Sequence, residues 1–457
     1  MEHTRIIISD LHVGMKDKFD IFASDDKPQL FESFIQHLRD LQKPIELIIN
    51  GDFVDFLQLQ PWNDLRRGSA LTKVGSIVEK SAYFFDELGK LLQDSQNQVV
   101  MLPGNHDVEL AYPEVGKVVR NAILKTAPGA ANRIRMFDTP DMRRTSYIPK
   151  INGVVVRIEH GNEGDPWNSL NYNALFTDAE TSANNFSYPP GTKLVYETMN
   201  EFKDLFRFVD LLKPEMPAVP LLLIALKPFM SVRKVPEASL IAIERLGNAA
   251  ITALRRAVLG GAPLGDEKEA TSPTVDDQLI EFLADELPED RVSDWSVEQF
   301  LHAEETDEGT LGGSFQRVRL WFVSWAVRGL ARFQAKQRGA QFYLDDHPKN
   351  TAAKGAKTRF EGDVKVVVFG HTHEALKTEF DDRVYVNSGT WANLIELPTD
   401  TGSDMLKWLQ DLADDKFEKT AFPTFVQFEP ADQGVDVSLN SWSLKGANTL
   451  WTKNISR

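Results

Sequence analysis

The sequence predicts an α/β fold interrupted by a large, mostly helical insertion. In the first third of the chain, short apolar runs that are typical of strands alternate with patterns that are typical of amphipathic helices. Each of these apolar runs stops at polar residues of the kinds that bind metals. Between His160 and Val364 the pattern becomes helical instead. A chain of 457 residues is long enough for two or three domains of ordinary size.

The predicted elements follow one another in a regular order. Four strands are expected in the first third and a fifth after the insertion, at residues 5–8, 47–49, 99–102, 154–158 and 364–369. Helices at 30–41 and 77–92 separate the first three strands, because their apolar residues recur at helical spacing. Two closing strands are expected at 425–428 and 435–439. An α/β sheet places a site beyond the carboxyl ends of its strands, where the polar residues lie here.

The region between the fourth and fifth strands differs from the rest. Helical stripes cover residues 193–213 and 316–333, and the acidic stretch at 266–308 is more typical of a solvated face or loop than of a functional tail. We therefore predict a discontinuous core domain, residues 1–162 plus 360–457, and a largely helical insertion or cap at 163–359.

The composition excludes several classes of protein. A net charge of −16 weighs against a nucleic-acid-binding protein, since phosphate backbones require clustered Lys and Arg, but it allows a small phosphorylated substrate beside bound metal ions. The absence of cysteine excludes disulfides, thiolate metal sites and cysteine nucleophiles, and is compatible with the cytoplasmic location that we expect.

No targeting or membrane-spanning segment is expected. The apolar residues before Ser9 are too few for a signal peptide. The most apolar run, residues 221–226, is flanked by prolines and Lys227 and is shorter than the ~20 residues of a spanning helix. Peripheral contact with a lipid surface through this run is an alternative, and a helix packed within the insertion is the favoured interpretation.

Seven residues at the strand ends predict a site for two metal ions: Asp10, His12, Asp52, Asn105, His160, His371 and His373. Any one of these histidines alone would more often be structural, but their shared position after strands favours a common role. Carboxylate, amide and imidazole ligands suit Mn, Fe, Zn or Co, and a bridging carboxylate holds two ions ~3.5–4 Å apart. We expect Asp10 and His12, and likewise His371 and His373, to alternate along extended chain and so to point the same way.

Five motifs give the chain a resemblance to a known family. Asp10-Leu11-His12, Gly51-Asp52-Phe53-Val54-Asp55, Gly104-Asn105-His106-Asp107, His160-Gly161 and Gly370-His371-Thr372-His373 resemble, in order, those of the calcineurin-like metallophosphoesterases. The resemblance covers residues 1–162 and about 360–440. It implies a four-layer αββα sandwich, in which two facing mixed β-sheets are flanked by helices.

The resemblance also implies roles for single residues. One ion would be held by Asp10, His12, Asp52 and His373, and the second by Asp52, Asn105, His160 and His371, with Asp52 as the bridge. His106 would be a catalytic residue that faces the scissile phosphate, and Asp55 would orient it. For Asp55 a helix N-cap is the alternative, and for Asp107 a loop-capping role is preferred to a chemical one.

The function that the resemblance implies is hydrolysis of a phosphoester or pyrophosphate bond in a small phosphorylated substrate, with a hydroxide that bridges the two ions as nucleophile. Protein Ser/Thr phosphatases of this superfamily carry arginine where Phe56 stands, which argues against that branch. The Gly-His-Thr-His ending and the acidic surface resemble bacterial members with small substrates, including UDP-diacylglucosamine pyrophosphatases and cyclic-nucleotide phosphodiesterases. A metal-dependent nuclease and a non-catalytic scaffold of the same fold are the alternatives. The insertion is expected to act as a lid, and nothing in the sequence indicates an oligomeric state.

Overall fold

A computed structural model describes most of the chain outside the expected insertion. The described residues are 2–17, 19–22, 27–61, 64, 67–136, 145–165, 168–170, 188–189, 191–192, 195, 200, 207, 211–212, 344–345, 351–395, 407–408, 411–412, 414 and 416–456. The expected helices at 193–213 and 316–333 and the apolar run at 221–226 lie almost entirely outside these residues. The insertion at 163–359 therefore stays a prediction.

The chain divides into two compact units. The first comprises Met1–Asn200, Tyr343–Asn393 and Thr420–Arg457 and holds both large β-sheets. The second comprises Glu201–Phe342 and Leu394–Lys419. Among the described residues of the second unit, Leu211, Leu212 and Leu412 are buried, and the backbone amide of Ile395 donates to the carbonyl of Leu211 at 2.7 Å.

The first sheet is built around parallel strands from the start of the chain. Its strands within the described residues are β1 (Thr4–Ile8), β2 (Ile45–Asn50), β3 (Gln98–Leu102), β4 (Ile134–Arg135), β14 (Thr424–Ala431), β15 (Gly434–Ser443) and β16 (Gly446–Ser456). Their order is β16-β15-β14-β1-β2-β3-β4, with β1 to β4 parallel and the other three joined antiparallel through β14 and β1. Strands β1, β2 and β3 consequently end at the same edge.

The second sheet joins the strands on either side of the expected insertion. Its described strands are β5 (Ser146–Tyr147), β6 (Lys150–Ile151), β7 (Val154–Glu159), β8 (Leu344–Asp345), β9 (Val364–Phe369), β10 (Ala375–Phe380) and β11 (Arg383–Ser388). The order is β5-β7-β9-β11-β10-β8, with β6 beside β7, and the neighbours β7, β9 and β11 are parallel. A separate two-stranded sheet pairs β12 (Asn393–Leu394) with β13 (Thr420–Ala421).

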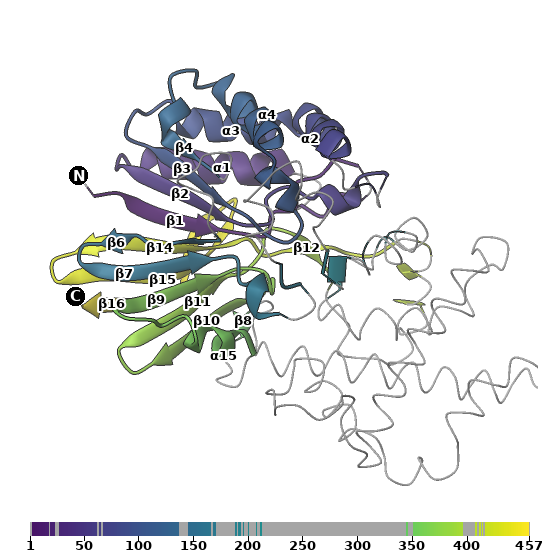
Figure 1. The fold of residues 1–457 in the computed structure, drawn as a ribbon. Helices are drawn as coiled ribbons and strands as arrows, with labels where there is room; N and C mark the ends of the chain where they lie inside the picture. The colour runs from purple at the N-terminus through teal and green to yellow at the C-terminus, as the bar shows by residue number, and fades with distance from the viewer. Residues whose placement is uncertain are drawn as a thin grey trace, which may run out of the picture. The chain divides into compact units, whose positions relative to one another are not determined.

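Helices cover the outer faces of both large sheets. The described helices are α1 (Lys27–Asp40), α2 (Arg67–Lys80), α3 (Ala82–Leu91), α4 (Pro113–Leu124) and α15 (Thr351–Lys357), with short 3-10 helices η1 (Phe56–Gln58), η2 (Val108–Ala111), η3 (Ala131–Arg133) and η5 (Asn162–Gly164). Helices α1 to α4 lie over the first sheet and α15 lies on the second (Figure 1).

The two sheets pack face to face through a shared apolar core. Ile48 and Val100 of the first sheet belong to the same buried cluster as Val366 and Val386 of the second. The first sheet's other face packs against α1 to α4, and α15 contributes Ala353 to the outer core of the second. The predicted four-layer αββα sandwich is confirmed.

One predicted helix is divided in two. The pattern at 77–92 predicts a single helix, but the structure ends α2 at Lys80 and begins α3 at Ala82. Ser81 lies between them with φ −109° and ψ 31°, and its hydroxyl donates to the carbonyl of Gly14 at 2.8 Å. This tertiary hydrogen bond stabilises a break that the apolar spacing does not reveal.

Among the helices described, none is long and apolar enough to cross a lipid bilayer.

Candidate metal centre

The predicted ligand residues all lie in loops that follow parallel strands. Strand β1 leads to Asp10 and His12, β2 to Asp52 and β3 to Asn105, all at the same edge of the first sheet. From the second sheet, β7 leads to His160, and β9 leads to His371 and His373. Six of the seven are buried, and the His371 side chain is 13% exposed.

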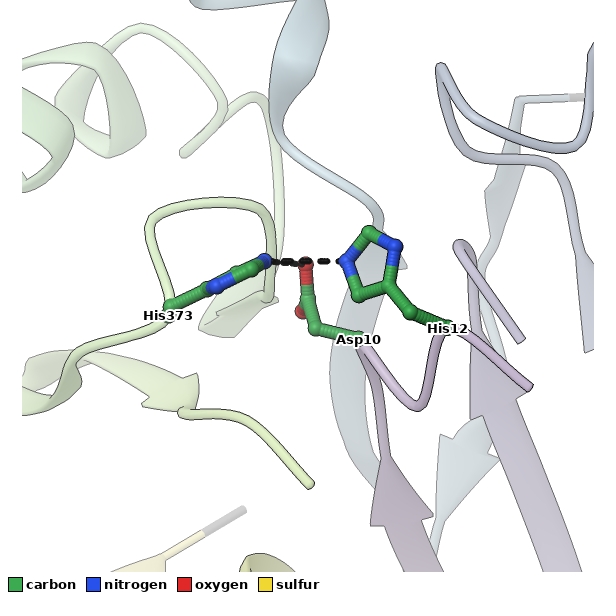
Figure 2. A group of neighbouring side chains, drawn as sticks. All are labelled: Asp10, His12 and His373. Atoms are coloured by element: carbon green, nitrogen blue, oxygen red, sulfur yellow. Dashed lines mark hydrogen bonds and ion pairs between the residues drawn. The ribbon is translucent and has the colours of Figure 1, made fainter. Parts of the chain in front are cut away.

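Asp10, His12 and His373 point at one another (Figure 2). The Nε2 atoms of His12 and His373 are 3.0 Å apart, and Nε2 of His373 is 3.3 Å from Oδ1 of Asp10. Two imidazole nitrogens that face each other beside a carboxylate are an arrangement that a divalent cation stabilises. The structure therefore brings together three of the four ligands that were predicted for the first ion.

Asp52 lies between this group and a second one. Its Oδ2 is 3.1 Å from Nε2 of His160 and 3.9 Å from Nε2 of His12. Oδ1 of Asn105 lies 3.2 Å from the same His160 nitrogen. Asp10, Asp52 and His160 also form a group whose potential ligand atoms lie within 4.8 Å of one another. The position of Asp52 beside both groups fits the bridging role that was predicted for it.

His371 makes different contacts from the other predicted ligands. Its backbone amide donates to both carboxylate oxygens of Asp10, at 3.1 and 2.9 Å, and its ring lies 5.4 Å from that of His160. Its Nε2, however, is 3.1 Å from Oδ2 of Asp165. Asp165 is a residue of the site that no sequence motif identified.

Asp55 contacts both a predicted ligand and the predicted catalytic histidine. Its Oδ2 lies 3.1 Å from Nδ1 of His12 and 3.1 Å from Nδ1 of His106, and accepts a hydrogen bond from Nε2 of Gln58 at 2.9 Å. Its Oδ1 accepts from the amide of Leu57 at 2.9 Å and so caps η1. Asp55 thus caps η1 and also contacts both histidine rings, so the two predicted alternatives for this residue are compatible.

Asp107 has the structural role that was preferred for it. Its two carboxylate oxygens accept from the amides of Gly104, at 2.7 Å, and Phe53, at 3.0 Å. These two amides belong to the loops after β3 and β2. The buried side chain of Asp107 therefore holds together the loops that carry Asn105 and Asp52.

The loop backbone at the predicted ligands differs from the expectation of extended chain. Asp10, His12, Asp52, His371 and His373 all have positive φ, between +50° and +68°. The expected alternation along extended chain is therefore wrong. The chain turns sharply at these positions, at a cost of about 1 kcal/mol or more each, and strain of this kind is concentrated at functional sites.

Two glycines allow the close packing of the ligands. Gly51 has φ +84°, and a Cβ at this position would collide with the ring of His160. A Cβ at Gly104 would collide with the carboxylate of Asp52. Both glycines are required because a ligand from another loop occupies the space of a side chain.

The charges of the site keep the carboxylates of Asp10, Asp52 and Asp55 ionised despite their burial. Burial opposes the ionisation of Asp10, but the hydrogen bond with His373 and the charge of His160 outweigh it and lower the pKa of Asp10 to about 2. Burial likewise opposes the ionisation of Asp52 and Asp55, yet the histidines His160 and His106 hold both pKa values well below the usual value.

The pKa values of His160 and Asp107 are raised instead of lowered. Burial disfavours the charged ring of His160, but the carboxylate of Asp52 raises its pKa to about 10. Without a cation this ring is therefore protonated, and an ion at Nε2 would replace the proton there. Burial and the charge of Asp52 raise the pKa of Asp107 to about 8.

The donor set fits a divalent transition metal. Ionised carboxylates, imidazole nitrogens and one amide oxygen converge from loops that are held by buried hydrogen bonds, and thiolates are absent from the sequence. The groups found among the described residues can hold metal ions, and the identity of the metal is not selected by these ligand types.

Comparison with known families gives one finding for this chain. A family model described as calcineurin-like phosphoesterase matches residues 3–203. The matched segment includes the loops from Asp10 to His160, whereas His371 and His373 lie beyond it. A search of curated proteins found no match.

Proposed function

We propose that this chain, whose residues 3–203 match the calcineurin-like phosphoesterase family, hydrolyses a phosphoester or pyrophosphate bond of a small phosphorylated substrate with the help of two divalent ions. The observation that carries this proposal is the position of Asp52 beside both groups of potential ligands. A single carboxylate between two such groups is an arrangement that suits a pair of neighbouring ions.

The proposed ligand sets combine these groups with residues of the five motifs, among them His371, which belongs to none of the groups found among the described residues. Asp10, His12, Asp52 and His373 hold one ion, and Asp52, Asn105, His160 and His371 hold the other. When bound, the two ions lower the pKa of a water molecule between them and neutralise the charge of phosphate oxygens. Manganese, iron, zinc and cobalt all suit this set of ligands.

His106 is the proposed residue for proton transfer to the departing oxygen. Its Nδ1 is 3.1 Å from the carboxylate of Asp55, which is ionised and therefore accepts the N–H of the ring. Nε2 of the same ring is then the nitrogen that can meet a substrate, and the His106 side chain is 23% exposed. Asp55 stabilises the charged form of the ring when His106 carries a second proton.

The test is hydrolysis by His106→Ala. We expect turnover of p-nitrophenyl phosphate or bis-p-nitrophenyl phosphate to fall about 10²–10⁴-fold. The metal content of the variant, measured by mass spectrometry, should equal that of the wild-type protein. Both substrates are assayed with metal-stripped protein to which Mn, Zn, Co or Mg is restored, and their rate ratio distinguishes monoesterase from diesterase chemistry.

His3→Ala is the matched control, because His3 bonds to the Gln96 carbonyl far from the site. This variant should keep full turnover. Unchanged turnover in His106→Ala would remove the role proposed for His106, and a wild-type protein without bound metal would overturn the metal-dependent function. If the protein digests DNA in the presence of manganese but does not hydrolyse the small esters, a nuclease is favoured.

A further inference from the structure

Asp165 is a carboxylate that the loop after β7 holds in place. It follows η5, and its amide donates to the carbonyl of Asn162 at 3.0 Å. Nδ2 of Asn168 donates to Oδ2 of Asp165 at 2.7 Å, and Nδ2 of Asn162 donates to the carbonyl of Asn168 at 2.9 Å. These bonds position Oδ2 of Asp165 at 3.1 Å from Nε2 of His371.

In two other histidines of the site, Nδ1 faces a hydrogen-bond acceptor and Nε2 faces the predicted ligands. His12 faces Asp55 with Nδ1 and faces the ligand group with Nε2. His160 donates from Nδ1 to the carbonyl of Asn50 at 2.8 Å and turns Nε2 toward Asp52. A histidine that binds a metal almost always donates its other ring nitrogen to an acceptor, which fixes the ring and strengthens it as a ligand.

His371 fits the same rule with its nitrogens exchanged. Its Nε2 faces the carboxylate of Asp165, so the lone pair of a neutral ring lies on Nδ1. Nδ1 is the ring nitrogen nearer to the main chain, and the His371 main-chain amide donates to both oxygens of Asp10. Nδ1 is then the ring nitrogen left for an ion, and the His371 ring centroid lies 5.4 Å from that of the predicted ligand His160.

We propose that Asp165 is a positioning residue for the second ion: it accepts the Nε2 hydrogen of His371 and thereby presents Nδ1 of His371 as the ligand. The proposal rests on the proposed function, since it assumes the two-ion site. Removal of such an acceptor typically weakens metal binding about 10–100-fold. The first ion should be unaffected, because His12 is oriented by Asp55 instead.

The experiment measures binding of Mn²⁺ to metal-stripped full-length protein, by calorimetry and by the electron paramagnetic resonance signal of the coupled ion pair. The variants are Asp165→Asn, Asp165→Ala, His371→Ala and the double variant Asp165→Ala/His371→Ala. Asp432→Asn is the control, since Asp432 is exposed in the turn between β14 and β15. Circular dichroism of the metal-free proteins confirms that each variant is folded.

We expect Asp165→Ala to weaken the second binding step about 10–100-fold and leave the first unchanged. Asp165→Asn should lose less, because its amide oxygen still accepts the Nε2 hydrogen. In the His371→Ala background the effect of Asp165→Ala should disappear, since Asp165 acts through that ring.

Two results would overturn the proposal. One is an unchanged affinity for the second Mn²⁺ ion in Asp165→Ala. The other is an equal loss of affinity when Asp165→Ala is added to His371→Ala, which would make Asp165 an independent ligand. Failure of the proposed function is a separate outcome, because wild-type protein would then bind fewer than two ions.

Discussion

At the scale of single residues, Asp55 connects metal binding with proton transfer. One of its oxygens lies 3.1 Å from both His12 and His106 and also accepts from Gln58, while the other caps η1. Three of the four contacts share the two lone pairs of Oδ2, and the fourth uses Oδ1. The orientation of a proposed ligand and that of a proposed catalytic ring therefore depend on the same side chain.

Asp55→Asn should impair both properties. An amide has a single acceptor oxygen, so it cannot serve Leu57, Gln58 and both rings at once. We expect kcat to fall about 10–100-fold, with weaker binding of the ion at His12. Steady-state kinetics and Mn²⁺ titration measure the two effects, with Asp432→Asn as the unaffected control. A fall in kcat without any change in Mn²⁺ affinity would show that His12 does not depend on Asp55.

Glu109 is a buried acid next to this site. It is 2% exposed, and neither carboxylate oxygen accepts a hydrogen bond from another residue in the described part of the chain. Burial raises its pKa to about 7 although the charge of Lys73 opposes this. The folded protein thus holds a proton that the unfolded chain releases near pH 4.5.

The stability that Glu109 contributes should be present below about pH 4.5 and lost as the pH rises through about 7. Glu109→Gln removes this titration. The free energy of unfolding of the variant, relative to that of the wild type, should therefore rise by about 2 kcal/mol from pH 5 to pH 8. Urea unfolding of both proteins at the two pH values measures the gain. An equal difference at both values would mean that Glu109 stays charged in the folded protein.

At the scale of elements, the strands that precede the motifs could be predicted and several others could not. Parallel strands buried on both faces are nearly continuous apolar runs, as in β1, β2, β3, β7 and β9, so the sequence identifies them. Strand β10 has the sequence ALKTEF and β16 has GANTLWTKNIS, which lack such runs. Their pairing partners make them strands, and a local pattern contains no information about partners.

The same distinction applies to the site. The predicted ligands follow recognisable strands and stand in motifs of fixed spacing, so their convergence could be expected. The role of Asp165 could not be predicted from the sequence, because its contact with His371 joins residues 206 positions apart and no motif includes it. The turns at Asp10 and His373 were also missed, since aspartate and histidine are common in extended chain as well as in left-handed turns.

Gly104→Ala tests how closely the loops after β2 and β3 are packed. The added Cβ would collide with the carboxylate of Asp52, so either the carboxylate or the loop must move. We expect weaker binding of both ions and a loss of about 2 kcal/mol or more of stability. Gly75→Ala in α2 is the matched control, because a Cβ there meets nothing within 4 Å and should stabilise the helix by about 0.5–1 kcal/mol. Wild-type ion affinity in Gly104→Ala would contradict the packing described.

At the scale of the whole molecule, the site joins two sheets. The first sheet supplies Asp10, His12, Asp52 and Asn105, and the second supplies His160, His371 and His373. Ions that bind residues of both sheets bind the folded protein and not the unfolded chain. Metal binding should therefore stabilise the whole sandwich and not one loop.

Removal of metal should lower the melting temperature. At a free ion concentration about 1,000 times the Kd, each ion adds about 4 kcal/mol to the free energy of unfolding. Calorimetric melting with Mn²⁺ and with excess chelator measures the difference, which should shrink in Asp52→Asn, where the proposed bridge is lost. Equal melting temperatures with and without Mn²⁺ would show that no ion of this kind links the sheets.

The neighbouring positions of β7 and β9 have a consequence for the length of the chain between them. The two strands are paired, and the amide of Gly370 donates to the carbonyl of His160 at 2.8 Å, so the connecting segment leaves and re-enters the sheet at adjacent points. For a flexible segment that joins two such neighbouring points, each doubling of its length costs only about 0.6 kcal/mol of closure entropy. A change of length beyond Asn168 would therefore leave the backbone at His160 and Gly370 fixed by the pairing of β7 with β9.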